Sequence, residues 1–142
     1  MKTRLLRVES ETHWSTYHSI RQHVLYELRG RNGYDENHPD EYKEQNIPLL
    51  FLWDDQPVGT VRLDQENENT LGVVRLVAIL PNFQRQGIGT AMMQEIETFA
   101  ANRGIRQLKT QAAKDAITFY EKLGWHIIDS SKRNPLMLKI LP

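Results

Sequence analysis

The sequence predicts a single domain of the mixed α/β (α+β) class, covering residues 1–142. Its length suits one domain with a full hydrophobic core. Short apolar or alternating runs typical of strands are interspersed with stretches in which apolar residues recur every three or four positions, as in amphipathic helices. Turn-forming residues separate some strand runs by only a few positions. The order of elements therefore predicts strands in hairpins together with at least two crossover helices.

The first predicted elements are a short strand and an amphipathic helix. Residues 5–8 contain the strand, and Ser10 or Thr12 can cap the helix that follows. The residues that define the apolar face and the end of this helix are Trp14, Tyr17, Ile20, Val24, Leu28, Gly30 and Gly33. The polar residues 31–46 predict an irregular insert with a short helix from Pro39, which is either a solvated connection or a recognition loop.

The middle of the chain contains three strand runs. Residues 48–53 and 58–64 flank a turn at 54–57 and predict a hairpin. The third run, residues 71–80, follows a second turn at 67–70.

A second amphipathic helix begins near residue 88. Its apolar face comprises Ile88, Met92, Ile96 and Phe99. Arg103 and Gly104 end it, with a cation in the last turn and glycine after it. The remaining predicted elements are a strand at 108–112, a helix at 115–123 closed by Gly124, and strands at 125–128 and 136–141.

The most informative stretch, residues 76–90, joins the third strand run to this second helix. An apolar run ends at Pro81, crosses a short polar turn and reaches Gly87 and Gly89 at the helix start. Backbone N–H groups at a helix start have no intrahelical acceptors and point outward, and the helix dipole adds partial positive charge there. Glycine removes the side chains that would keep a phosphate away from this backbone. The stretch therefore predicts a pyrophosphate cradle.

Two motifs together carry a family resemblance. The first is the spacing Gln84-x-x-Gly87-x-Gly89 directly after an apolar strand, and the second is the run Phe-Tyr-Glu-Lys-Leu-Gly-Trp at 119–125. They resemble the R/Q-x-x-G-x-G/A turn and the F-Y-E-K-L-G-F/W segment of the GNAT superfamily of acyl-CoA-dependent N-acetyltransferases. The element order agrees from about residue 5 to 140. A dinucleotide-binding G-x-G-x-x-G fingerprint does not fit, because position 92 is Met.

The resemblance implies a fold and a cofactor. The fold would be a GNAT-like mixed, mostly antiparallel central sheet, splayed open at a cofactor cleft, with helices on both faces. Acetyl-CoA would be the co-substrate, with its pantetheine along the strand that ends at Ile79. The implied cofactor-binding residues are Val77, Ala78, Ile79, Gln84, Arg85, Gln86, Gly87, Ile88, Gly89 and Thr90. Arg85 either adds a cationic contact to phosphate or is a solvated arginine.

The resemblance also implies the chemistry. An N-acetyltransferase moves an acetyl group from acetyl-CoA to a primary amine of a small molecule, amino acid or peptide by direct transfer. Tyr120 matches the family tyrosine that protonates the leaving sulfur, and an unperturbed phenol with a pKa of about 10 stays protonated at neutral pH. Backbone N–H groups near Val77 or Ile79 would stabilise the oxyanion. On spacing alone, Tyr120 would instead be a core aromatic residue beside Phe119 and Leu123.

The general base is not evident from the sequence. Many family members carry a glutamate where this chain has Val73, and an asparagine where it has Ala113. Valine cannot accept a proton. A water chain could carry the proton, or a carboxylate from Glu27, Asp64 or Glu66 could face the cleft. We expect each of these three to be a surface charge.

Two features point to opposite classes of acceptor. Arg75 is the predicted substrate-binding residue, because a guanidinium pairs with a carboxylate in a fork geometry. The acidic segment 35–41 would instead attract a cationic amine. The sequence does not decide between an acidic and a cationic acceptor.

Composition narrows the function classes. Eighteen basic residues balance eighteen acidic ones, so no charge excess indicates nucleic acid or an anionic membrane surface as a partner. The absence of cysteine excludes disulfides, thiolate metal sites and a cysteine nucleophile. With no signal peptide or apolar run of membrane-spanning length, we expect a cytoplasmic protein. His13, His18 and His23 are spaced by five and do not share a helical face, so no metal site is predicted.

Two other readings compete with an active acetyltransferase. A catalytically weak acyl-CoA-binding sensor or partner-binding module is favoured by the valine at position 73. A nucleotide-binding domain of another type would also use a phosphate cradle. The family resemblance further allows a homodimer, for which the sequence shows no decisive interface.

Overall fold

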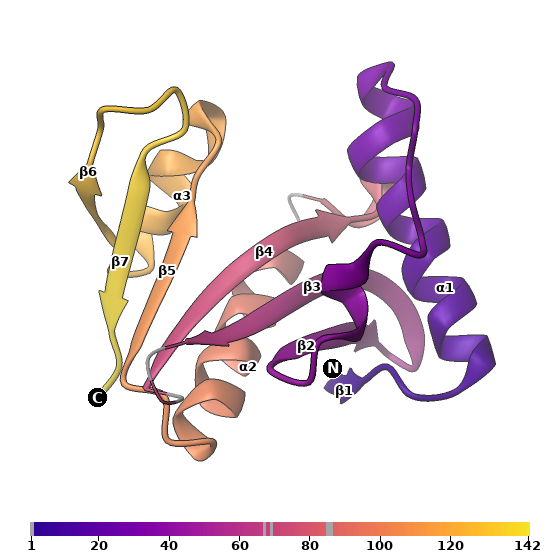
Figure 1. The fold of residues 1–142 in the computed structure, drawn as a ribbon, viewed down its shortest axis with the longest axis horizontal. Coiled ribbons are helices and arrows are strands. Elements are labelled where there is room, and N and C mark those ends of the chain that lie inside the picture. Colours follow the sequence, from indigo (N-terminus) through magenta and orange to yellow (C-terminus); the bar gives the residue numbers. More distant parts are fainter. Residues whose placement is uncertain (1, 67, 69, 85–86) are drawn as a thin grey trace.

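Seven strands form one sheet in the computed structural model, which describes residues 2–66, 68, 70–84 and 87–142. The strand order is β1-β2-β3-β4-β5-β7-β6 (Figure 1). Neighbouring strands are antiparallel except for β4 and β5, which are parallel. The strands span Thr3–Arg7 (β1), Asn46–Trp53 (β2), Gln56–Glu66 (β3), Leu71–Ile79 (β4), Gln107–Gln111 (β5), His126–Asp129 (β6) and Leu136–Ile140 (β7). The predicted mixed, mostly antiparallel sheet is therefore confirmed.

Helices cover both faces of this sheet, as predicted. Helix α1 (Glu11–Arg21) packs Tyr17 and Ile20 against Leu50 and Ala78 on one face. On the other face, α2 (Ile88–Asn102) and α3 (Ile117–Lys122) enclose the larger part of the core (Figure 1). Short 3₁₀ turns are η3 (Pro39–Tyr42) in the polar insert, η4 (Pro81–Phe83) before α2 and η5 (Lys114–Ala116) before α3.

The first helix changes its winding after α1. It continues as a π turn, η1 (Gln22–Tyr26), and a 3₁₀ turn, η2 (Glu27–Arg29). The side chain of Ser10 caps its start by accepting a hydrogen bond from the His13 N–H at 3.1 Å, which decides between the two predicted caps. The placement of Leu28 on the apolar face was wrong, because this side chain is 55% exposed in the 3₁₀ turn. Apolar spacing does not distinguish short α, π and 3₁₀ turns.

Strand β4 carries a bulge near its C-terminal end. Thr60 of β3 lies opposite Ala78, and Arg62 lies opposite Arg75, so β4 has one more residue than β3 between these pairs. The extra residue falls at Leu76–Val77, and Leu76 has a φ of 57°. A bulge bends its strand and increases the local twist.

Strands β4 and β5 pair over only three positions. The pairs are Leu71 with Gln107, Gly72 with Leu108 and Val73 with Lys109. Beyond them the two strands part, and Figure 1 shows β4 running toward α1 while β5 runs toward α3. The predicted opening of the sheet is present at this point.

Candidate functional site

A cleft of about 520 Å³ lies beside the parted end of β4. Six of the ten predicted cofactor-binding residues line it, at the end of β4 and in the turn that leads into α2. Asp115, Ala116 and Phe119 form the wall on the α3 side, and Val24 and Arg29 form the wall on the α1 side. The predicted residues that line the cleft are Val77, Ile79, Gln84, Gly87, Gly89 and Thr90.

The turn into α2 exposes backbone in the way that the sequence indicates. Gly87 caps α2 with a φ of 77°, a left-handed conformation that favours glycine. The Gln84 side chain donates to the Ile79 carbonyl at 2.8 Å and so ties the turn to the end of β4. A Cβ on Gly89 would lie 3.4 Å from the side chains of Ile79 and Phe119. The first N–H groups of α2 have no acceptor within the helix and can bind an anion.

Two of the predicted cofactor-binding residues, Ala78 and Ile88, do not line the cleft with their side chains. Ala78 is 2% exposed and packs under α1, and Ile88 is fully buried in the main core. Both could therefore contribute only backbone atoms. Arg85 and Gln86 lie outside the described residues.

Tyr120 lies on α3 with its ring in the core. It is 5% exposed and makes edge contacts with Phe119 and Trp125, with ring centroids 5.2 and 5.3 Å away. Its pKa is affected by Thr110 of β5, whose hydroxyl donates to the Val74 carbonyl of β4 at 2.9 Å. The phenol therefore lies where β4 and β5 part, while its neighbour Phe119 lines the wider cleft.

The electrostatics of Tyr120 keep it protonated. Burial raises the pKa of the phenol, and the Thr110 side chain opposes this rise. The net pKa is above the ordinary value of 10, so the hydroxyl carries its proton throughout the physiological range. It is therefore available as a proton donor.

A chain of alternating charges runs inward from Arg75. The Arg75 side chain is 43% exposed and donates to Asp64 at 2.9 Å. Asp64 also accepts two hydrogen bonds from Arg62, and Arg62 in turn contacts Glu41 at 3.1 Å. Glu41 then pairs with Arg21 of α1. Buried charges persist when they are paired in this way.

The three carboxylates considered as general bases are paired with arginine or histidine side chains and do not line the cleft. Asp64 is 5% exposed, so the expectation that it is a surface charge was wrong, and both of its oxygens accept hydrogen bonds from arginine. Glu66 and Glu27 are exposed as expected, Glu66 lying 3.9 Å from Arg75 and Glu27 pairing with His23 at 3.0 Å. None of these three carboxylates is among the described residues that line the cleft. Val73, at the position of the usual glutamate, is 9% exposed.

A second, more polar pocket adjoins Arg75. It has a volume of about 330 Å³ and lies between β3, β4 and the segment around η3. Its lining residues are Asp40, Lys43, Gln45, Asn46, Arg62, Asp64, Gln65, Glu66 and Arg75. No local sequence pattern indicates this pocket, because its residues come together only through strand pairing and the fold of the polar insert.

The described part of the chain has neither a metal-binding cluster nor a membrane-spanning helix. Residues 2–66, 68, 70–84 and 87–142 contain no group of three or more metal-ligating side chains close enough to hold an ion. No helix within these residues is long and apolar enough to cross a membrane.

Comparison with known proteins identifies the class. A family model described as the Acetyltransferase (GNAT) family matches residues 11–125. A Drosophila melanogaster protein named a probable N-acetyltransferase, san, is 32% identical over 106 residues, which cover 70% of this chain and 57% of the relative. A Bacillus subtilis (strain 168) protein with a provisional acetyltransferase name is 28% identical over 120 residues, covering 84% of this chain and 80% of the relative.

A solved structure supports the fold. The PaiA N-acetyltransferase of Thermoplasma acidophilum, crystallised with coenzyme A, superposes with a TM-score of 0.78 over 99% of each chain at 15% identity. Together, the fold and these matches define a CoA-dependent acyltransferase. The chain belongs to the GNAT family of acetyltransferases.

Proposed function

We propose that this protein transfers the acetyl group of acetyl-CoA directly to a primary amine of a small molecule, amino acid or peptide. The observation that carries the proposal is the cleft, in which the glycine turn before α2 meets the parted edge of β4. An extended chain could pair with that free edge while its phosphates bind the N–H groups of α2. Val77 and Ile79 would supply the backbone for pairing, and the turn from Gln84 to Thr90 would supply the phosphate cradle.

The proposed reaction is a single displacement at the thioester. The amine nitrogen attacks the carbonyl carbon, and the backbone N–H groups near Val77 or Ile79 stabilise the negative oxygen. The C–S bond then breaks, and its electron pair goes to sulfur. Tyr120 gives its proton to that sulfur as the general acid. Since none of the candidate carboxylates lines the cleft, we propose that water carries the proton away from the amine.

Binding of acetyl-CoA is the first experiment. Calorimetric titration should give a dissociation constant on the order of micromolar, about −8 kcal/mol, with no heat from ATP as the control. Binding of ATP without binding of acetyl-CoA would favour a nucleotide-binding domain of another type. No binding of either compound near millimolar concentration would count against the cofactor assignment.

Arg75 is the proposed contact for an acidic acceptor. Its guanidinium is half-exposed beside the polar pocket, although Asp64 and Glu66 already offset part of its charge. We expect Arg75→Ala to raise KM for carboxylate-bearing acceptors far more than KM for neutral amines, because the fork contact is lost. Steady-state kinetics with paired acceptors measure this.

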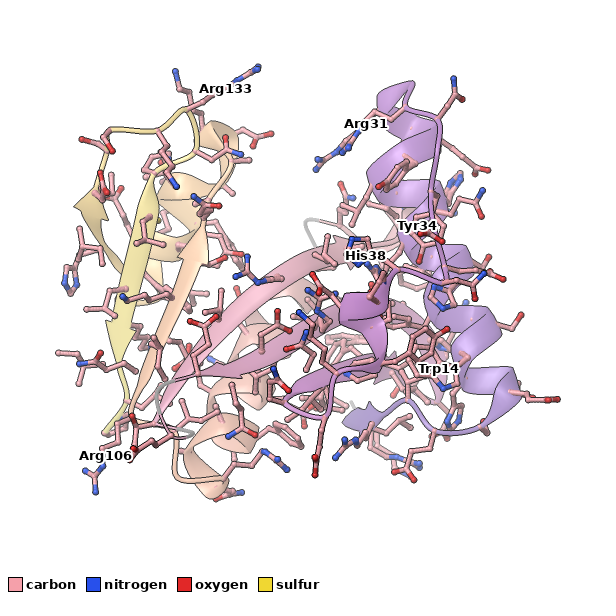
Figure 2. All side chains as sticks on the ribbon, in the orientation of Figure 1. Trp14, Arg31, Tyr34, His38, Arg106 and Arg133 are labelled. Carbon is pink, nitrogen blue, oxygen red and sulfur yellow. The ribbon has the colours of Figure 1, made fainter. Side chains whose placement is uncertain are left out.

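A matched control is Arg106→Ala. Arg106 is exposed at the end of the molecule opposite the parted strands (Figure 2) and should leave both KM values unchanged. Equal effects of Arg75→Ala on acidic and neutral acceptors would contradict the proposed contact.

The alternative function is a catalytically weak acyl-CoA-binding sensor or partner-binding module. The valine at position 73, where many family members carry a glutamate, favours it. Release of free CoA in the presence of an amine separates the two, because only an acetyltransferase produces it. A cytoplasmic location and a homodimer remain expectations from the sequence.

A further inference from the structure

A groove of about 350 Å³, here called the α1 groove, lies between α1 and the polar insert. It shares no described residue with the cofactor cleft or with the polar pocket beside Arg75. Its lining residues are Glu11, Trp14, Ser15 and His18 from α1, and Glu36 and Tyr42 from the insert. The four helical residues are spaced as i, i+3, i+4 and i+7, so they lie on one face of α1, toward the insert.

Aromatic rings form the body of the α1 groove. Trp14 stacks on His18, with ring centroids 5.5 Å apart and an angle of 21° between the ring planes. Trp14 also contacts Tyr42 of η3, with ring centroids 5.7 Å apart. Because Tyr42 is 60% exposed, most of its ring surface is open to a ligand. The face of an aromatic ring is negative and attracts a cation, so these rings favour an apolar molecule that carries a positive charge.

Two carboxylates of the α1 groove have no cation of the chain beside them. Elsewhere in the acidic segment 35–41, Asp40 pairs with Lys43 at 2.8 Å, and Glu41 is buried with two arginines. Glu36 and Glu11 instead line the groove, and neither forms an ion pair within the part of the chain that the structure describes. The negative charge of the groove is therefore not offset by the protein itself.

His18 does not supply the missing positive charge. Burial and the nearby charge of Arg21 lower the pKa of its imidazole, so the ring is neutral at physiological pH. The side chain is 8% exposed, and its Nδ1 lies 2.5 Å from the Tyr34 hydroxyl oxygen. In the tautomer whose Nδ1–H donates to Tyr34, Nε2 is an acceptor. A ligand N–H can therefore find an acceptor nitrogen in the α1 groove.

We propose that the α1 groove binds the protonated amine of a small organic molecule, with its positive charge beside Glu11 and Glu36 and its alkyl part against the aromatic rings. An inorganic cation would leave the ring surface unused, and a neutral molecule would leave both carboxylates without a partner. The groove is a binding site separate from the acetyl-CoA cleft, and it does not depend on the proposed transfer reaction.

Binding of n-butylammonium chloride to the wild-type protein, without acetyl-CoA, tests the site. The neutral isostere 1-butanol has a similar shape and no charge. NMR titration of the Trp14 indole N–H, assigned by its loss in Trp14→Phe, should give a Kd on the order of millimolar for n-butylammonium and binding about 10-fold weaker for 1-butanol. Sodium chloride at equal concentration controls for ionic strength. Saturating CoA should leave the Kd unchanged, because the two sites share no described residue.

Matched variants locate the probe in the α1 groove. Glu36→Gln keeps the shape and removes the charge, so it should raise the Kd for n-butylammonium about 5-fold. Glu44→Gln, which changes an exposed acid of the insert outside the groove, should leave the Kd unchanged. Tyr42→Leu should raise the Kd by a similar factor, whereas Tyr42→Phe keeps the ring, loses only the hydroxyl contact with the Glu36 carbonyl, and should bind as the wild type does.

Four results would overturn the inference. Equal binding of n-butylammonium and 1-butanol would reduce the groove to an apolar surface, and equal effects of Glu36→Gln and Glu44→Gln would mean diffuse attraction. An unmoved Trp14 resonance at about 50 mM probe would show that no site exists. Loss of binding with CoA would place the probe in the cofactor cleft. If Trp14→Phe does not fold, Trp53→Phe and Trp125→Phe assign the resonance by elimination. Since the titration contains no acetyl donor, its result is independent of whether the protein transfers acetyl groups.

Discussion

Gly89→Val should weaken acetyl-CoA binding from about micromolar to about millimolar or beyond, a loss of about 4 kcal/mol. Gly89 lies in the first turn of α2 and lines the cleft. A Cβ there would already be 3.4 Å from the Ile79 and Phe119 side chains, so the two methyl groups of valine must project into the cleft or displace its walls. Either result keeps phosphate from the N–H groups of the turn.

The fold should tolerate this change, because Gly89 does not have a positive φ. Calorimetric titration measures the affinity, and circular dichroism with thermal unfolding shows whether the protein is folded. Thr98→Val, a β-branched substitution near the other end of α2, should leave the affinity unchanged. Retained affinity in Gly89→Val would mean that the glycine serves packing alone.

The turn before α2 could be predicted from the sequence because its determinants are local. A strand end, a proline, a glycine at a left-handed position and an amphipathic helix are adjacent in the chain, and each constrains the backbone by itself. The same holds for the placement of α3 after a strand and before Gly124. The turn and the two elements that it joins were therefore predicted at the correct place, and their role in cofactor binding stays a prediction.

The polar surroundings of the site could not be predicted in this way. Asp64 alternates with apolar residues along β3 and resembles a solvated charge, but the face that it occupies is covered by η3 and α1. Its partners come from residues 11 positions later on β4 and two positions earlier on β3. Thr110 is similar, because its contact with the Val74 carbonyl depends on the register of β5 against β4. Such contacts depend on tertiary structure, and no local spacing indicates them.

Tyr120→Phe should lower kcat for acetyl transfer by roughly 10²-fold or more, the usual range for loss of a general acid. Phenylalanine keeps the ring contacts with Phe119 and Trp125 and removes only the hydroxyl at the apex of the opening. Because the ring packing is kept, the variant should remain folded and bind acetyl-CoA. Release of free CoA with a reactive amine is the measurement.

Tyr42→Phe is the matched control. Tyr42 is 60% exposed in the polar insert, and among the described residues its hydroxyl contacts only the Glu36 carbonyl.

The pH dependence of the rate gives a second check. Because burial raises the pKa of Tyr120, its ionisation should not lower the wild-type rate as pH approaches the ordinary phenol value of about 10. Unchanged turnover in Tyr120→Phe would show that the sulfur leaves as a thiolate or takes its proton from water, and Tyr120 would then be a packing residue of the core.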